Sequence, residues 1–167
     1  MEKEKIKRVV REGYAKIAKQ NSSCCAPAKS CCGSGHPAED ISKNIGYTEE
    51  ELRSVPEGSN LGLGCGNPVA LASLKAVEVV LDLGSGAGFD CFLAASRVGD
   101  KGRVIGVDMT PEMLEKAREN AKKINSTNVE LNPGLMPART SWTTSTCPKR
   151  RGRCSRKSGS TLIFRTG

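Results

Sequence analysis

The strongest chemical signal in this sequence is the glycine-rich stretch Asp82-Leu-Gly84-Ser-Gly86-Ala-Gly88, which lies between an apolar segment and a helical one. Glycines permit a sharp turn and let a ligand come close to the backbone, because no Cβ stands in the way. The amide groups at the start of the next helix then face that ligand. Dinucleotide sites use G-x-G-x-x-G, but here Phe89 stands where the third glycine of that pattern would be. The spacing therefore disfavours a dinucleotide.

A second signal is Asp108, which ends the next apolar segment 20 residues after Gly88. An acid at that point can accept hydrogen bonds from both ribose hydroxyls of an adenosine, and Met109 can cover the adenine. Each feature also has an ordinary explanation as a strand end or a turn, but their combination favours a ligand. The loop spacing resembles that of class I methyltransferases. This resemblance implies S-adenosyl-L-methionine as the cofactor, bound by Asp82, Gly84, Gly86, Gly88, Asp108 and Met109.

Cysteines are the third candidate for chemistry. Eight are present, including Cys24-Cys25 and Cys31-Cys32 in a segment of Ser, Ala, Gly and Pro, and Cys65 farther on. Thiolates are soft ligands that favour thiophilic ions. The spacing differs from the paired C-x2-C of structural zinc sites, and His36 makes a poor fourth ligand. Spacing alone leaves a zinc site, other thiol chemistry and inert thiols all open.

The hydrophobic pattern predicts the elements that position these residues. A helix is expected over 2–20, with residues 6, 9, 10, 13, 14 and 17 on one face. Thr48 and Glu51 have the capping-box spacing of a second, short helix, and residues 69–75 suit one or two helical turns. Strands over 77–83, 103–107 and 128–131 alternate with helices over 89–97 and 111–124, the latter with Thr110 as N-cap. This β-α-β-α-β order predicts an α/β fold, the first half of a doubly wound sheet.

Charge and composition divide the chain into three parts. Residues 1–60 are expected to be a helical and Cys-rich segment, and 61–131 a partial S-adenosylmethionine-binding α/β domain. Residues 132–167 are a tail without any acidic residue, and the whole net charge of +8 arises after residue 130. The tail also lacks sustained periodicity, which favours a frameshifted or damaged gene end. The alternative, a nucleic-acid-binding tail, has one aromatic residue, Trp142, near its basic cluster and no folded platform for stacking.

A family resemblance appears when the motifs are taken together. Gly64-Cys65-Gly66-Asn67-Pro68, the segment 80–91 and the segment 107–113 resemble the prokaryotic arsenite S-adenosylmethionine methyltransferases from about Val9 to Glu130. The resemblance implies a Rossmann-like class I methyltransferase fold and catalytic roles for Cys65 and Cys32, although four N-terminal cysteines compete for the second role. It also implies that Cys65 binds arsenic.

The chemistry of the family explains why thiols accompany a methyl donor. Trivalent arsenic bound to thiolates keeps a lone pair, which can attack the methyl group in line. The implied partners are an arsenite–thiol complex and a reductant of the thioredoxin or glutathione type. We expect a cytoplasmic protein that binds neither a membrane nor nucleic acid, since no apolar run reaches about 18 residues and no secretory signal is evident.

The tail departs from this family. Its members continue after the third strand with further strands and arsenic-binding cysteines, whereas Cys147 and Cys154 stand outside the family's motifs. We therefore expect impaired methylation of arsenite by this chain. Two alternatives remain open: a thiol-rich protein that binds a metal or metalloid without turnover, and a methyltransferase of another small molecule.

Overall fold

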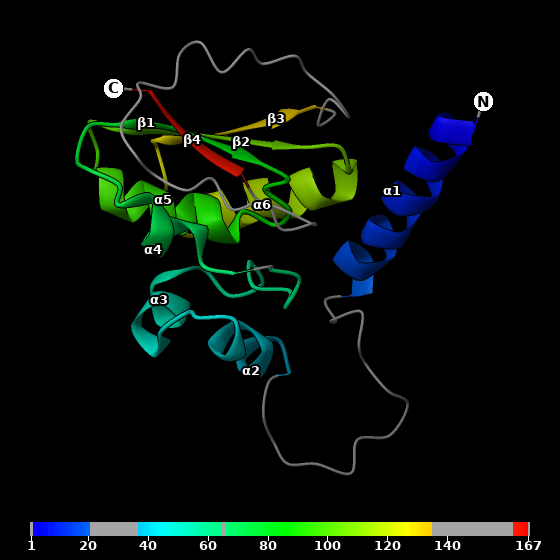
Figure 1. Cartoon of the computed structure of the whole chain (residues 1–167), viewed down its shortest axis with the longest axis horizontal. Helices are drawn as coiled ribbons and strands as arrows, with labels where there is room; N and C mark the ends of the chain where they lie inside the picture. Colours follow the sequence, from blue (N-terminus) through cyan, green and yellow to red (C-terminus); the bar gives the residue numbers. More distant parts are fainter. Residues whose placement is uncertain (1, 21–36, 65, 135–161, 167) are drawn as a thin grey trace.

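The computed structural model describes residues 2–20, 37–64, 66–134 and 162–166. A four-stranded sheet has the order β3-β2-β1-β4. Its strands are β1 (Val79–Leu83), β2 (Arg103–Asp108), β3 (Val129–Pro133) and β4 (Leu162–Thr166). Strands β1, β2 and β3 are parallel and are connected by α5 (Phe89–Val98) and α6 (Pro111–Lys123), which lie on the same face of the sheet (Figure 1). This arrangement confirms the predicted β-α-β-α-β order.

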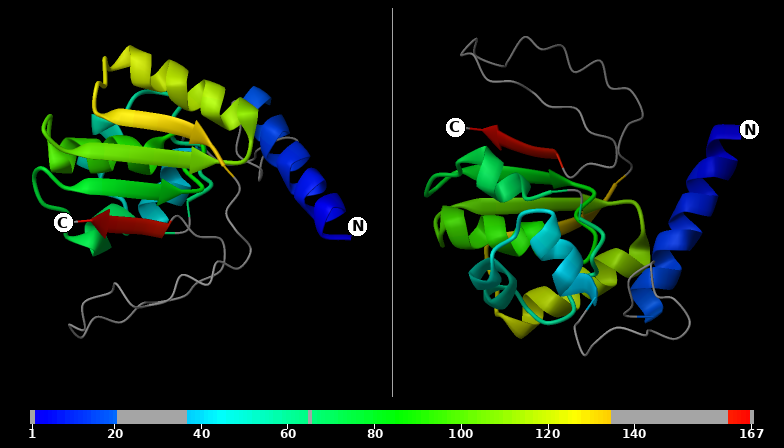
Figure 2. Two further views of the ribbon diagram at one scale, coloured as in Figure 1. Left: turned by 90° about the horizontal axis from the view of Figure 1, so that it is seen from above. Right: turned by 60° about the horizontal axis from the view of Figure 1, so that its bottom comes forward.

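The core lies between the sheet and these two helices. Alternation along β1 directs Val80 and Asp82 toward the helices, where both are fully buried, and leaves Val79, Leu81 and Leu83 half-buried on the opposite face. Within the described residues, no helix covers that opposite face (Figure 2). Gly106 is required by the packing, because a Cβ there would lie 2.7 Å from the Cys91 sulfur.

The tail contains one element that the sequence did not predict. Strand β4 pairs antiparallel with β1, from Val79 opposite Thr166 to Leu83 opposite Leu162. The sequence pattern predicted no strand in this segment, although its Leu-Ile-Phe stretch has high β propensity. Strand β3 continues to Pro133, two residues beyond the predicted strand over 128–131. Residues 135–161 lie outside the described residues.

The first predicted strand also begins later than expected. Val77 has a φ of +71° and is exposed, so the extended backbone starts only at Val79. The positive φ breaks the strand conformation, although the residue type favours it.

Four helices precede the sheet: α1 (Glu2–Gln20), α2 (Pro37–Asn44), α3 (Glu49–Ser54) and α4 (Pro68–Ala72). Helix α2 was not predicted, whereas α1, α3 and α4 were. The capping box is present, because Glu51 N donates to Thr48 Oγ1 and Thr48 N donates to the Glu51 carboxylate.

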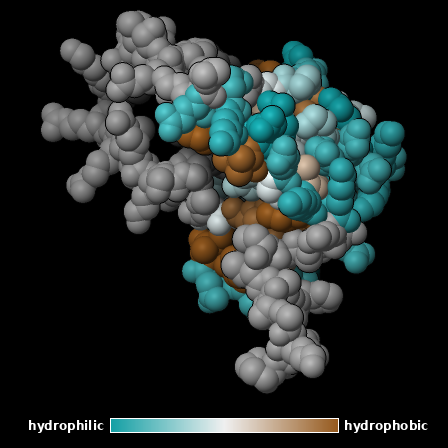
Figure 3. Space-filling view, turned by 90° about the vertical axis from the view of Figure 1, so that its right-hand side faces the viewer, coloured by the Kyte–Doolittle hydropathy of each residue, from teal (hydrophilic) through white to brown (hydrophobic). Residues whose placement is uncertain are grey.

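Helix α1 packs differently from its hydrophobic pattern. Its last turn contacts the body: Ile17 and Ala18 join a small cluster with Met113, and Lys19 pairs with Glu112 at 3.3 Å. Most of the predicted apolar face is exposed, namely Ile6, Val9, Val10 and Tyr14. In the view toward the side where α1 lies, hydrophobic surface gathers at the centre of the face, with hydrophilic groups around it (Figure 3).

Candidate functional site

Hydrogen bonds fix the glycine loop against the neighbouring strand. The amides of Gly84 and Ser85 both donate to the carbonyl of Val107, at 2.7 and 3.1 Å, and the amide of Gly88 donates to the carbonyl of Ser85 at 2.9 Å. The loop therefore lies at the carboxyl ends of β1 and β2, where ligands bind in open α/β sheets.

Two of the three glycines keep space open above the loop. A Cβ added at Gly84 or Gly86 would have no atom within 4 Å, and both residues have positive φ, at +85° and +52°. Gly88 serves a different purpose, since a Cβ there would lie 2.8 Å from the Phe92 ring. Gly84 and Gly86 thus form a cradle that a ligand can enter, whereas Gly88 allows α5 to begin close to the loop.

Asp108 is held in place by backbone amides. Its Oδ2 accepts from Gly86 N at 3.0 Å, and its Oδ1 accepts from Thr110 N at 2.8 Å. A carboxylate can accept about four hydrogen bonds, so both oxygens retain capacity for hydroxyl donors. Thr110 occupies the N-cap of α6 as predicted, but its own side chain makes no capping hydrogen bond. The half-buried Met109 follows directly.

Asp82 lies beneath the loop instead of in the open space above it. The carboxyl is fully buried, and the Cys91 thiol donates to its Oδ2 at 3.1 Å. Burial raises the pKa of Asp82 to about 7, with a further contribution from the Asp90 carboxylate. Its Oδ1 and the Ser85 hydroxyl have no hydrogen-bond partner among the described residues. Any role of Asp82 toward a ligand remains a prediction.

A tyrosine–aspartate pair, which the sequence did not predict, connects the N-terminal part to the loop. Tyr47 Oη donates to Asp90 Oδ1 at 2.7 Å, although the two residues are 43 positions apart. Burial raises the pKa of Asp90 to about 6 and raises that of the Tyr47 hydroxyl far above its ordinary value. Burial likewise raises the pKa of Cys91, so this thiol stays protonated. Cys91 is therefore a structural residue here and no nucleophile.

The glycine loop and the N-terminal part surround an open hollow of about 80 Å³. One wall is the glycine loop with Phe89 and Asp90, and the other comes from the N-terminal part. The residues of this second wall are Ser42, Tyr47, Ser59, Asn60, Leu61, Leu63 and Gly64. Asn60 organises it, because its Oδ1 accepts from both Ser42 Oγ and Gly62 N.

Most of the predicted thiol residues cannot be placed. Cys24, Cys25, Cys31, Cys32, Cys65, Cys147, Cys154 and His36 lie outside the described residues. The chain neighbours of Cys65 are described, however, and Gly64 lines the hollow. In the described ranges, no group of three or more His, Cys, Asp or Glu residues could hold a metal ion.

Several known proteins are similar to this chain in sequence. Residues 74–137 match the family described as a methyltransferase domain. An arsenite methyltransferase of Halobacterium salinarum is 50% identical over 138 residues, which cover 78% of this chain and 35% of the relative. This chain is a homologue of arsenite methyltransferases. The arsenite methyltransferase of Aquipseudomonas alcaligenes is 38% identical over 132 residues, which cover 76% of this chain and 35% of the relative.

A protein-L-isoaspartate O-methyltransferase of Ignicoccus hospitalis is a more distant match, 30% identical over 99 residues, with 53% of this chain and 47% of the relative covered. The chain spans about a third of the length of the two arsenite methyltransferases. These matches confirm the predicted partial class I methyltransferase fold and support S-adenosylmethionine as the cofactor. In the described part of the chain, none of the helices combines the length and hydrophobicity needed to cross a membrane.

Proposed function

We propose that this homologue binds S-adenosylmethionine in the hollow above the glycine loop and serves the methylation of trivalent arsenic held by cysteine thiolates. When bound, the cofactor supplies a methyl group on a positively charged sulfur. The proposal depends on one observation: Gly84 and Gly86 leave the floor of the hollow open, and Asp108, at the end of the next strand, is oriented by the Gly86 amide.

The charge of the hollow supports this cofactor over a dinucleotide. Among the described residues that line the hollow, Asp90 is the one with a charged side chain, and none is Lys or Arg. A carboxylate attracts a sulfonium or ammonium group, whereas it repels a pyrophosphate. Because the pKa of Asp90 is raised to about 6, the group is mostly ionised at neutral pH. Asp90 therefore favours a cationic ligand there.

The assignment of arsenic as acceptor depends on the thiols. Gly64, the residue before Cys65, lines the wall opposite the glycine loop. A thiolate at Cys65, with a second from Cys32, would hold the metalloid next to the cofactor and replace a bimolecular encounter with a positioned one. A thioredoxin- or glutathione-type reductant is proposed as the partner that returns these thiols to the reduced state.

Equilibrium binding of radiolabelled S-adenosylmethionine to the 167-residue chain tests the site. Gly86→Val fills the cradle and Asp108→Ala removes the carboxylate, so both variants should lose at least about tenfold in affinity. Glu49→Gln is the matched control, since Glu49 is an exposed residue that pairs with Lys43 and Arg53. Unchanged affinity in both site variants contradicts the proposed function.

A second candidate function is metalloid binding without turnover. It is favoured by the CC-x5-CC cluster of residues 24–32, which needs no cofactor. Mass spectrometry of the reduced chain with arsenite separates the two. Retention of arsenite that is lost in Cys31→Ser/Cys32→Ser, in a chain that does not bind S-adenosylmethionine, supports this candidate. Binding of S-adenosylmethionine that disappears with Asp108→Ala excludes it.

A further inference from the structure

The hydrogen bond between Tyr47 and Asp90 lies at the hollow, because both residues line it. The Tyr47 hydroxyl donates to Asp90 Oδ1 at 2.7 Å, and its ring meets that of Phe89 edge to face, with 4.8 Å between the ring centroids. Asp90 is 7% exposed and follows Phe89 in the first turn of α5. A carboxylate can accept about four hydrogen bonds, so one phenol leaves it capacity for a ligand.

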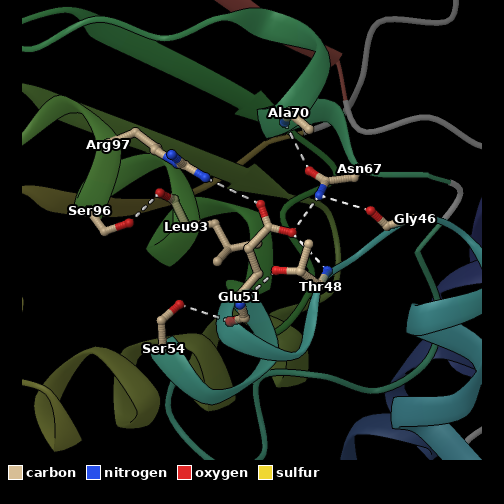
Figure 4. A network of polar contacts seen from close by, with 9 residues as sticks. All are labelled: Gly46, Thr48, Glu51, Ser54, Asn67, Ala70, Leu93, Ser96 and Arg97. Carbon is tan, nitrogen blue, oxygen red and sulfur yellow. Dashed lines mark hydrogen bonds and ion pairs between the residues drawn. The ribbon is translucent and has the colours of Figure 1, made fainter.

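A network of hydrogen bonds fixes the backbone on both sides of Tyr47 (Figure 4). Asn67 Nδ2 donates to the Gly46 carbonyl at 3.3 Å, and the Thr48 amide donates to Glu51 Oε2 at 3.1 Å. Asn67 Nδ2 also donates to Glu51 Oε2, at 2.7 Å, so the two neighbours of Tyr47 belong to one network. The buried Tyr47 side chain therefore extends toward α5 from a backbone that is held in place.

We propose that Asp90 recognises a positively charged group of the cofactor, and that Tyr47 is a positioning residue that holds the Asp90 carboxylate for this contact. The inference rests on the proposed function and deepens it, because it names the group that senses the charge of the cofactor and the residue that controls this group. The N-terminal part would then contribute to cofactor affinity through Tyr47, although the glycine loop belongs to the sheet.

Protonation of Asp90 should control this recognition, because only the ionised carboxylate attracts a cation. Burial raises the pKa of Asp90 to about 6, the hydrogen bond from Tyr47 opposes this rise, and the Glu51 carboxylate of α3 adds to it. Two more titratable groups interact with Asp90: Asp82 of β1, whose own pKa is raised to about 7, and the Cys91 thiol of α5, which stays protonated. Cofactor affinity should therefore fall as the pH is lowered through the pKa of Asp90.

Equilibrium binding of labelled S-adenosylmethionine to the 167-residue chain, measured from pH 5 to pH 8, tests the proposal. For a carboxyl with a pKa of about 6, the affinity at pH 5 should be roughly tenfold lower than at pH 7. In Asp90→Asn, the amide oxygen can still accept the hydrogen bond from Tyr47, but the charge is gone. The affinity of this variant should be roughly tenfold lower at pH 7 and should lose the dependence on pH.

Tyr47→Phe removes the hydroxyl and keeps the ring next to Phe89. The pKa of Asp90 should rise without this donor, so the midpoint of the affinity profile should move up by about one pH unit. The affinity of Tyr47→Phe should then return to within about twofold of the wild-type value at pH 8, whereas a structural defect would lower it equally at every pH. Tyr14→Phe is the matched control, because Tyr14 is exposed on α1 and should leave the profile unchanged.

Three results would overturn the inference: a wild-type affinity that is constant from pH 5 to pH 7, an equal dependence on pH in Asp90→Asn, or an unchanged midpoint in Tyr47→Phe. S-adenosylhomocysteine carries the ammonium group but no sulfonium. If Asp90→Asn weakens its binding as well, Asp90 recognises the ammonium; if only S-adenosylmethionine is affected, Asp90 recognises the sulfonium, and both outcomes support the proposal. Failure of the proposed function is distinguishable, since it appears as unchanged affinity in Gly86→Val and Asp108→Ala.

Discussion

Alanine at Gly86 and alanine at Gly88 should have different consequences, although the two residues belong to one motif. At Gly88, an L-residue must adopt a φ of +90°, and its Cβ would lie 2.8 Å from the buried Phe92 ring and 3.4 Å from Ala117. The left-handed conformation costs about 1–2 kcal/mol, and overpacking costs about 1–3 kcal/mol more. We therefore expect Gly88→Ala to lower the free energy of unfolding by about 2–5 kcal/mol.

At Gly86 only the conformational part of that cost applies. The φ is +52° and no atom lies within 4 Å of the added Cβ, so the loss of stability should be about 1–2 kcal/mol. The methyl group would instead occupy the space that we assign to S-adenosylmethionine. The affinity for the cofactor should consequently fall at least about tenfold in Gly86→Ala.

Urea unfolding and equilibrium binding of labelled cofactor, applied to both variants, measure the two effects. Phe92→Leu in the Gly88→Ala background should recover part of the lost stability, because the aromatic ring that meets the new Cβ is removed, and a double-mutant cycle isolates that coupling. Equal destabilisation of the two single variants, or full cofactor affinity in Gly86→Ala, refutes the distinction drawn between the two glycines.

Three further predictions follow from other parts of the molecule. Asp82 has a pKa of about 7 in the folded chain and about 3.8 when unfolded, so the folded state binds more protons between these values. The free energy of unfolding should therefore fall as pH rises from about 4 to about 7. Urea midpoints should depend less on pH in Asp82→Asn than in the exposed control Asp100→Asn. Ala18→Glu should destabilise the fold by about 1–3 kcal/mol, whereas Val9→Lys should change unfolding by less than about 0.5 kcal/mol, because Ala18 is buried and Val9 is exposed. The 167-residue chain should bind cofactor yet form no methylated arsenic above background, since Cys147 and Cys154 stand outside the family's motifs; chromatography of the arsenic products checks this, and product above background contradicts it.

The parts of the fold that the sequence predicted are those determined by local pattern. Apolar segments and the glycine loop placed β1, α5, β2, α6 and β3 within a few residues, because burial on a sheet or helix face imposes its own period. The same reasoning predicted that Asp108 lies beside the glycine loop, because parallel neighbouring strands end at the same edge of a sheet. The capping box at Thr48 and Glu51 was equally local.

The parts that it missed depend on contacts between distant segments. Tyr47 and Asp90 form a hydrogen bond across 43 positions, and nothing around either residue indicates a partner. To predict strand β4, one would need to know which edge of β1 is free to pair with a distant segment. The apolar stripe of α1 was predicted from its period, but periodicity gives the face and not its partner. Ile17 and Ala18 pack with Met113 on α6, whereas most of the stripe is exposed.

Glu51 shows how a local motif can acquire a second, non-local role. As the third residue of α3 and the acidic partner of the capping box, it would need only one backbone hydrogen bond and could lie at the protein surface. Instead, its side chain is largely buried, accepts a hydrogen bond from the Asn67 amide and forms an ion pair with the Arg97 guanidinium. A partly buried carboxylate that lost these donors would be costly, so the acid favours the arrangement in which the Gly64–Pro68 motif and α5 are both in place. The third residue of a short helix thereby connects α3 to Asn67, ahead of α4, and to α5, which begins at the glycine loop.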